Sequence, residues 1–317
     1  MARILYVVHR YGFPGGSEVY TQNMAEETKL RGHDVSVLTG ETGATIINGI
    51  HVSLDPNVVM TQKWDLIVVH GGNVPMQNLI LHHSAQIPNP ILYLQILPSD
   101  TEVCQTGLKN CRWIGCSTAV DWQHAEKHGA RDRSVYIPHG ITTNTSLGKP
   151  GFKQKHGVVG PMFLSSGGFW PHKAMNELAE LWTKLEIPAT LVLTGYDNRY
   201  GIQPKTTNKV KSFFLSDRQD VLNAISEADC YLMHSYEEGF GLVLLEAMWN
   251  STPWIARDIA GANLLKAWGQ TYSTDEQLAN LLLNFNELTW DLTGAKTYVE
   301  NNHSIVNTVD AILKLVQ

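Results

Sequence analysis

The feature that most constrains this chain is an alternation of short apolar segments with amphipathic ones, which occurs twice along the sequence. In the first half, apolar and β-branched segments predict strands at residues 4–9, 34–39, 66–69, 91–95, 113–117 and 134–137. Helical spacing falls between some of them, at residues 17–31, 75–84 and 119–128. Strands that are apolar on both faces and alternate with helices predict an open, doubly wound parallel sheet.

A polar stretch from about residue 140 to 160 predicts a linker, after which the alternation starts again. Strands are expected at residues 161–165, 189–194, 230–234 and 254–256, and helices at 174–185, 219–227 and 242–249. We therefore expect an α/β protein with two Rossmann-like domains, residues 1–145 and 146–301. They would face an interdomain cleft at the carboxyl ends of both sheets. Residues 302–317 predict an amphipathic last helix that crosses back to the first domain.

Charge and composition argue against several classes of protein. The net charge is −6, with −2 in residues 1–145 and −4 in the rest, so neither half has the basic surplus of a nucleic-acid or anionic-membrane binder. No apolar run approaches the roughly 20 residues that cross a bilayer. The first apolar run is too short for a signal peptide, so a cytoplasmic location is expected.

The cysteines and the adjacent histidines gave no indication of a metal site. Cysteines stand at 104, 111, 116 and 230, without the short Cys-x-x-Cys spacing of a zinc site. They are expected to be buried free thiols. His82 and His83 are adjacent and would point to different sides of a helix. No metal ion and no resident cofactor are therefore expected.

Two glycine-rich turns follow the first strand of each expected domain. Gly15 and Gly16 open the first helix, where free N–H groups favour an anion, although a tight turn explains them equally well. Residues 167–173 (GGFWPHK) end on Lys173, a compact cation suited to a diphosphate. A solvated lysine at a helix start is the alternative, but the helix dipole disfavours a cation there. Neither turn is the Gly-x-Gly-x-x-Gly fingerprint of a dinucleotide-binding dehydrogenase.

Residues 238–246 (EGFGLVLLE) are the most informative segment of the chain. Glu238 lies in a loop after an expected strand, and a helix begins at about Leu242. Glu246 then falls in an almost entirely apolar helix, where a carboxylate is costly unless it has a hydrogen-bonding partner. Two ligand hydroxyls would serve, while the N–H groups at the helix start would accept phosphate. The segment thus combines the contacts that a nucleoside diphosphate sugar requires.

At this point the sequence resembles glycosyltransferase family 4, whose members have the GT-B fold. The resemblance covers nearly the whole chain and is carried by Glu-x7-Glu with its Gly-Phe-Gly core, Thr252-Pro253, and residues 14–18 (PGGSE) and 31–35 (RGHDV). Residues 65–70 resemble the family's later strand ending in histidine, and residues 137–140 (IPHG) its Pro-Asn-Gly hinge segment.

The resemblance implies metal-independent transfer from a nucleotide sugar with retention of configuration. Glu238 would contact the donor sugar and Glu246 the ribose, and His70 would position or stabilise the transferred sugar. Phosphate contacts would come from Lys173 and the backbone near the helix start, together with Gly16. The donor-binding residues implied in this way are Gly16, Gly168, Lys173, Glu238, Gly239, Phe240, Gly241, Leu242, Val243 and Glu246.

One departure concerns the diphosphate. Where the family has an arginine before its lysine, this chain has Gly168, and Ala174 replaces the glycine after Lys173. Arg199, Lys205, Lys209 and Lys211 form a basic stretch that either compensates for the missing arginine or is a solvated loop.

Transfer from a UDP- or GDP-sugar, with UDP-glucose favoured, to a hydroxyl acceptor is the leading hypothesis. The acceptor would be a glycan, a lipid-linked sugar or a small molecule. No basic amphipathic helix appears in the first domain, which slightly favours a soluble acceptor. The alternatives are a non-catalytic sugar-nucleotide-binding subunit and glycosylation of a modified nucleic acid, which the charge disfavours. The sugar, the linkage and the oligomeric state are left open.

Overall fold

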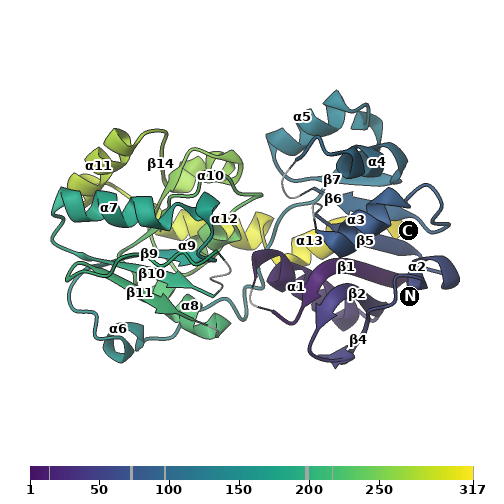
Figure 1. The fold of residues 1–317 in the computed structure, drawn as a ribbon, viewed down its shortest axis with the longest axis horizontal. Coiled ribbons are helices and arrows are strands. Elements are labelled where there is room, and N and C mark those ends of the chain that lie inside the picture. The colour runs from purple at the N-terminus through teal and green to yellow at the C-terminus, as the bar shows by residue number, and fades with distance from the viewer. Residues whose placement is uncertain (14, 72–73, 96–97, 197–199, 216, 317) are drawn as a thin grey trace. The chain divides into compact units, whose positions relative to one another are not determined.

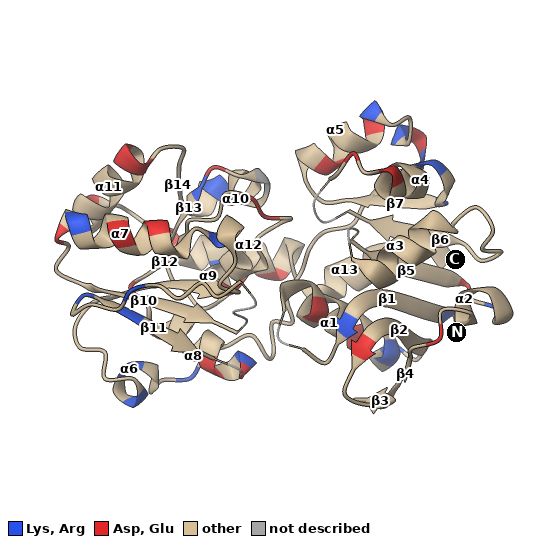
Figure 2. Ribbon diagram, viewed as in Figure 1, with Lys and Arg blue, Asp and Glu red and all other residues tan. Residues whose placement is uncertain are grey.

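The computed structural model describes the chain except for residues 14, 72–73, 96–97, 197–199, 216 and 317 (Figure 1). The chain forms two compact units, one made of Met1–Thr142 with Asn302–Gln317 and the other of Thr143–Asn301. Figure 2 shows acidic and basic residues on both units, with neither sign confined to one of them. Among the described residues, no helix is both long and apolar enough to cross a membrane.

The first unit is built on an eight-stranded sheet with the order β3-β4-β2-β1-β5-β6-β7-β8. Its strands are β1 (Arg3–Tyr11), β2 (Asp34–Thr42), β3 (Ile46–Ile47), β4 (Ile50–Ser53), β5 (Leu66–His70), β6 (Ile91–Leu94), β7 (Trp113–Cys116) and β8 (Ser134–Tyr136). All pairs are parallel except β3 with β4. Its helices are α1 (Gly16–Leu30), α2 (Val58–Thr61), α3 (Pro75–His82), α4 (Glu102–Asn110), α5 (Ala119–Lys127) and α13 (Ile305–Leu313), with the 3-10 turns η1 (Arg131–Arg133) and η5 (Lys314–Val316).

The second unit has a six-stranded parallel sheet with the order β11-β10-β9-β12-β13-β14. The strands are β9 (Met162–Gly167), β10 (Thr190–Gly195), β11 (Val210–Phe214), β12 (Cys230–Met233), β13 (Trp254–Arg257) and β14 (Gln270–Tyr272). The helices are α6 (Phe152–Lys155), α7 (Met175–Leu185), α8 (Arg218–Glu227), α9 (Leu242–Trp249), α10 (Ala260–Leu265), α11 (Asp275–Leu283) and α12 (Leu292–Asn302), with η2 (Pro171–Lys173), η3 (Lys266–Trp268) and η4 (Phe285–Glu287).

The predicted fold class, two α/β domains on parallel sheets, is confirmed. The central strands have mainly apolar, buried residues, as in β5, where four apolar residues and His70 are all buried. The strands that the sequence did not predict are short or lie at sheet edges: β3, β4, β11 and β14. Edge strands mix polar with apolar residues because one side faces solvent, so they lack the continuous apolar signal.

The last helix, α13, packs on α1 in the first unit (Figure 1). Thr308 Oγ1 donates a hydrogen bond to the Pro138 carbonyl at 2.7 Å, and Arg31 pairs with Asp310. The apolar face of α13 is buried, and the Ile312 side chain has no exposed surface. The amphipathic pattern of this segment therefore reflects burial against α1.

We expect Ile312→Ala to lower the free energy of unfolding of the first unit by about 2–4 kcal/mol, because it leaves a cavity under α13. Val306→Ala, on the exposed side of the same helix, should change it by less than about 0.5 kcal/mol. Urea unfolding followed by circular dichroism measures both. Equal effects of the two substitutions would show that α13 is not held by this apolar face.

Candidate functional site

The second sheet changes its direction of chain progression between β9 and β12, which are neighbours in space but not in sequence. In the order of the sheet, β10 and β11 lie on one side of this point, and β13 and β14 lie on the other. Loops that leave the carboxyl ends of two such strands separate and form the usual ligand crevice of an open α/β sheet. The glycine-rich turn follows β9 and the Glu238 loop follows β12, so both predicted donor segments lie at this position.

Lys173 and Glu238, which the sequence assigned to the donor, meet at this edge. Lys173 Nζ lies 2.5 Å from Glu238 Oε1, and Ser235 Oγ donates to the same oxygen at 2.7 Å. The two charged side chains are only 15% and 14% exposed. The Tyr236 N–H also donates to the His172 carbonyl at 2.8 Å, which fixes one loop against the other. The pair is therefore a partly desolvated charge pair held by the backbone on both sides.

Glu246 is buried on α9, as its apolar surroundings predicted, with its side chain 6% exposed. Its partner in this structure is Arg218, the first residue of α8, whose guanidinium pairs with Glu246 Oε1. Sequence analysis did not identify Arg218. The available signal was a cation in the first turn of a helix, where the dipole disfavours it, beside the N-cap Asp217.

The Gly-Phe-Gly core sets the start of α9. Gly241 is the N-cap, with φ +86°, a left-handed conformation that glycine adopts without the cost of a β-carbon. Phe240 is buried and anchors the turn. The first N–H groups of a helix have no acceptor within the helix, so those of Leu242 and Val243 offer an anion-binding start. Gly239, beside them, is half-buried.

The structure explains why no arginine stands at position 168. A β-carbon on Gly168 would lie 2.5 Å from the Trp170 indole, so the ring occupies the space into which a side chain would project. Lys173 is therefore the cation that this turn supplies. The following Ala174 has φ +50°, a conformation that usually calls for glycine.

Among the described residues, the basic stretch that was one candidate replacement for the arginine does not lie beside the predicted donor loops. Lys211 is the second residue of β11 and donates to the Gly157 carbonyl, so it lies near the amino end of that strand. Lys209 precedes the strand, Lys205 is exposed, and Arg199 lies outside the described residues. Arg218 instead follows the carboxyl end of β11, the same edge as the donor loops.

In the first unit, Gly16 begins α1, and a β-carbon there would have open space around it. Glu18 approaches the same turn, and its carboxylate pairs with Arg10 Nε at 3.2 Å and accepts from Ser17 Oγ at 3.1 Å. Pro14, part of the same motif, lies outside the described residues. The turn is thus compatible with close approach of a ligand, but its helix start already has one carboxylate nearby.

His70 ends β5 and is buried. Its Nδ1 lies 2.8 Å from Thr21 Oγ1, and that hydroxyl donates to the Ser17 carbonyl. Thr21 therefore accepts, His70 Nδ1 carries the proton, and Nε2 keeps a free lone pair with no hydrogen-bond partner among the described residues. Burial lowers the pKa of His70 to about 3, so the imidazole is neutral. Of the two predicted roles, positioning fits this group better than stabilisation by a positive charge.

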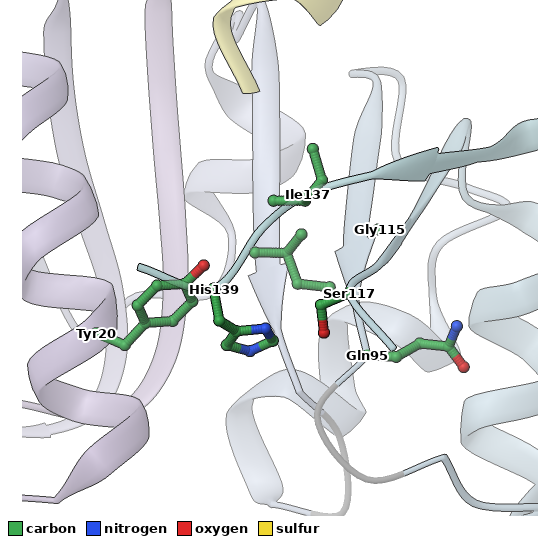
Figure 3. A pocket seen from close by; sticks show the side chains of 7 residues that line it. Tyr20, Gln95, Gly115, Ser117, Ile137 and His139 are labelled. Carbon is green, nitrogen blue, oxygen red and sulfur yellow. The ribbon is translucent and has the colours of Figure 1, made fainter. Parts of the chain in front are cut away.

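A small pocket lies at the carboxyl ends of β6, β7 and β8 and was not predicted as a site (Figure 3). Its polar lining residues are Tyr20, Gln95, Ser117 and His139. The His139 ring stacks on Tyr20 with centroids 4.9 Å apart, and burial lowers the pKa of His139 to about 3. The available sequence signal was a polar residue directly after a buried strand, which applies to Gln95 and Ser117.

No metal ion was expected, but three potential metal ligands of the first unit lie close together. His124 and His128 stand four residues apart on and just after α5, and Asp100 joins them, with candidate ligand atoms within 4.8 Å of one another. The expectation rested on cysteine spacing, on the adjacent pair His82 and His83, and on the absence of a His-x-x-x-His pattern. The last ground was wrong, because His124 and His128 have this spacing. All four cysteines are free and buried, as expected.

Comparison with solved structures gives the fold its name. HepE from Anabaena, in complex with UDP-glucose, superposes with a TM-score of 0.81 at 20% identity, covering 99% of each chain. WaaG, a glycosyltransferase involved in lipopolysaccharide biosynthesis, gives 0.73 at 16% identity over 99% of each chain. The catalytic domain of starch synthase IV from Arabidopsis thaliana, bound to ADP and acarbose, gives 0.75 at 12% identity over 99% of this chain and 98% of that one. The protein has the GT-B fold.

The sequence itself adds a narrower result. Residues 151–269 match the family model described as glycosyl transferases group 1, which spans all the predicted donor residues of the second unit. No curated protein sequence matches the chain.

The two buried histidines of the first unit predict sensitivity to mild acid. Unfolded histidine has a pKa near 6.5, whereas His70 and His139 stay neutral down to about pH 3. Between these values the unfolded state binds more protons, so the free energy of unfolding should fall as the pH falls below 6.5. The loss at pH 5 should be up to about 2 kcal/mol for each histidine.

Urea unfolding at pH 7.5 and pH 5.0 measures this loss. His139→Gln should remove part of it, and His82→Gln, which changes an exposed histidine, should not. A wild-type stability that is the same at both pH values would contradict the assignment of neutral buried imidazoles.

Proposed function

We propose that this protein is a glycosyltransferase that moves a sugar from a nucleotide sugar to a hydroxyl acceptor with retention of configuration and without a metal ion in the transfer step. The observation that carries the proposal is the Lys173–Glu238 pair, held beside the α9 start where β9 and β12 part. The group 1 glycosyltransferase match over residues 151–269 supports it. The UDP-glucose complex of the similar HepE supports a donor of that kind.

In the donor complex, Glu238 accepts hydrogen bonds from hydroxyls of the sugar, and Glu246 accepts them from the ribose. Arg218 occupies Glu246 Oε1, which leaves Oε2 available and fixes the direction of the carboxylate. Lys173 and the N–H groups of Leu242 and Val243 bind the diphosphate. Gly16 and Gly168, which carry no side chain, allow the ligand to approach the backbone.

In the reaction, the bond between the anomeric carbon and the diphosphate oxygen breaks, and the electron pair leaves with the diphosphate. The acceptor oxygen forms its bond on the same face, and its proton passes to the departing phosphate oxygen. The protein therefore acts by stabilising negative charge on the diphosphate and by orienting both substrates. Lys173 supplies the positive charge at the leaving group.

His70 has a role that follows from its neutral state. Its free Nε2 accepts a hydrogen bond from a hydroxyl of the transferred sugar and so orients the ring. The acceptor is a glycan, a lipid-linked sugar or a small molecule, and the polar pocket of the first unit is the candidate binding place for one of its hydroxyls (Figure 3). The mixed charges of both units favour such an acceptor over a nucleic acid (Figure 2).

We expect Glu246→Ala to weaken donor binding by about 10- to 150-fold, because a hydrogen bond to a charged group contributes about 1.5–3 kcal/mol.

Lys173→Ala should raise the donor concentration required and lower kcat/KM by about 100-fold or more, since it removes charge at the leaving group. Glu237→Ala and Lys184→Ala change exposed residues of the same unit and should leave both quantities unchanged. Wild-type kinetics in both Glu246→Ala and Lys173→Ala would refute the site assignment.

The donor itself is identified by a panel of nucleotide sugars, tested for thermal stabilisation and for hydrolysis. A ligand present at 100 times its Kd stabilises the folded state by about 2.7 kcal/mol, so the cognate donor should raise Tm clearly. Stabilisation without hydrolysis or transfer would favour the alternative of a non-catalytic sugar-nucleotide-binding subunit. A response to none of the sugars would reject the proposal.

A further inference from the structure

Two histidines of the first unit converge on one carboxylate oxygen of Asp100. Together the three residues form a group of potential metal ligands. His124 Nε2 lies 3.3 Å from Asp100 Oδ1, and His128 Nε2 lies 2.7 Å from the same oxygen. The two imidazoles are one helical turn apart, and their ring centroids are separated by 4.7 Å. Asp100 comes from the segment between β6 and α4, so the three side chains join two separate parts of the chain.

The tautomer of His124 is set by Gln95, a buried residue directly after β6. Gln95 Nε2 donates to the Asp121 carbonyl at 3.2 Å, so its amide oxygen faces the histidine. His124 Nδ1 lies 2.7 Å from that oxygen and must donate to it. The lone pair is therefore on Nε2, the atom that faces Asp100. An imidazole held in this way by a second residue is typical of metal-binding histidines.

This lone pair is left without a partner. His124 Nε2 is buried and accepts no hydrogen bond from the described residues, and the His124 side chain is 9% exposed. A buried polar atom without a partner is costly, so a histidine oriented for packing alone would be expected to use this nitrogen. His124 Nε2 is thus a buried nitrogen that is oriented to bind a metal ion and is not used by any described hydrogen bond.

We propose that Asp100, His124 and His128 bind a divalent transition-metal ion, with Zn²⁺ as the best fit. Two imidazole nitrogens and one carboxylate oxygen suit Zn²⁺ rather than Mg²⁺ or Ca²⁺, which prefer oxygen ligands. In a tetrahedral site with bonds of about 2.1 Å, ligand atoms lie about 3.4 Å apart. The His124–Asp100 distance already matches this spacing, and the His128–Asp100 contact opens slightly as its proton is replaced by the metal.

Lys127 does not occupy the metal position. Its ammonium pairs with the other carboxylate oxygen of Asp100, Oδ2, and so leaves Oδ1 to the two histidines. A fourth ligand, a water molecule, would complete the tetrahedron from the solvent side, because Asp100 is exposed. The ion would fasten the segment before α4 to the end of α5. It would also fix Gln95, which lines the polar pocket of Figure 3.

The test is Zn²⁺ binding by the full chain, measured by calorimetry after treatment with a chelator. We expect one ion per chain, a rise in Tm on binding, and no response to Mg²⁺. His124→Ala and His128→Ala should each weaken Zn²⁺ binding by about 100-fold or more. Gln95→Ala should weaken it by about 10- to 100-fold through loss of the imidazole orientation. Co²⁺ in place of Zn²⁺ should give the absorption spectrum of a tetrahedral site in the wild type but not in His124→Ala or His128→Ala.

Two control variants test whether Zn²⁺ binding requires these particular ligands. Lys127→Met removes the ion pair but no ligand, so it should bind Zn²⁺ at least as tightly as the wild type. His82→Ala with His83→Ala removes two exposed histidines and should leave binding unchanged. If Zn²⁺ binding is absent, or if it survives both His124→Ala and His128→Ala in chains with an unchanged circular dichroism spectrum, the cluster is only an ion-pair network. Neither result depends on the proposed sugar transfer.

Discussion

The proposed donor-binding half of this protein depends on the position of two strands that are adjacent in space but 68 residues apart at their first residues, Met162 and Cys230. Their adjacency places Lys173 against Glu238, where both side chains are largely removed from water. A pair this buried gains little net stability, because desolvation offsets the attraction between the charges. A ligand that offers hydroxyls to the carboxylate and phosphate to the ammonium replaces each partner with an equivalent one. The arrangement is therefore better understood as a preorganised binding site than as a stabilising contact.

Local sequence patterns predicted most of the fold, because central parallel strands are apolar on both faces. They failed at β11 (VKSFF) and β14 (QTY), where an edge position admits polar residues and removes the signal. They also missed the helices α4, α11 and α12. The same limit applies to the site. The apolar neighbours of Glu246 showed that it needs a polar partner, but not that Arg218 of α8 provides one. That pairing depends on how α8 packs on α9, which no local pattern records.

Two positions in the turn between β9 and α7 differ from the pattern that the sequence resemblance implied. At Gly168, the Trp170 indole lies where a β-carbon would project, so a side chain there would require the indole to move. Ala174, where glycine would be unstrained, is kept at φ +50°, which costs roughly 1–2 kcal/mol. Strain of this kind persists only where the surrounding structure holds it, and it gathers at functional turns. Gly168 and the left-handed Ala174 thus leave Lys173 as the cation of this turn.

Burial of the first unit's histidines is consistent with the charge that the proposed sugar transfer would develop. As the diphosphate leaves, the anomeric carbon and ring oxygen become positively charged, so a cation beside the sugar would oppose the reaction. A histidine in water is partly cationic near neutral pH, whereas burial lowers the pKa of His70 to about 3. Its proton is committed to Thr21, and Nε2 presents only a lone pair. In the proposed reaction, desolvation thus makes His70 a neutral hydrogen-bond acceptor rather than a cation that would repel the developing charge, and Lys173 would supply the positive charge for the diphosphate.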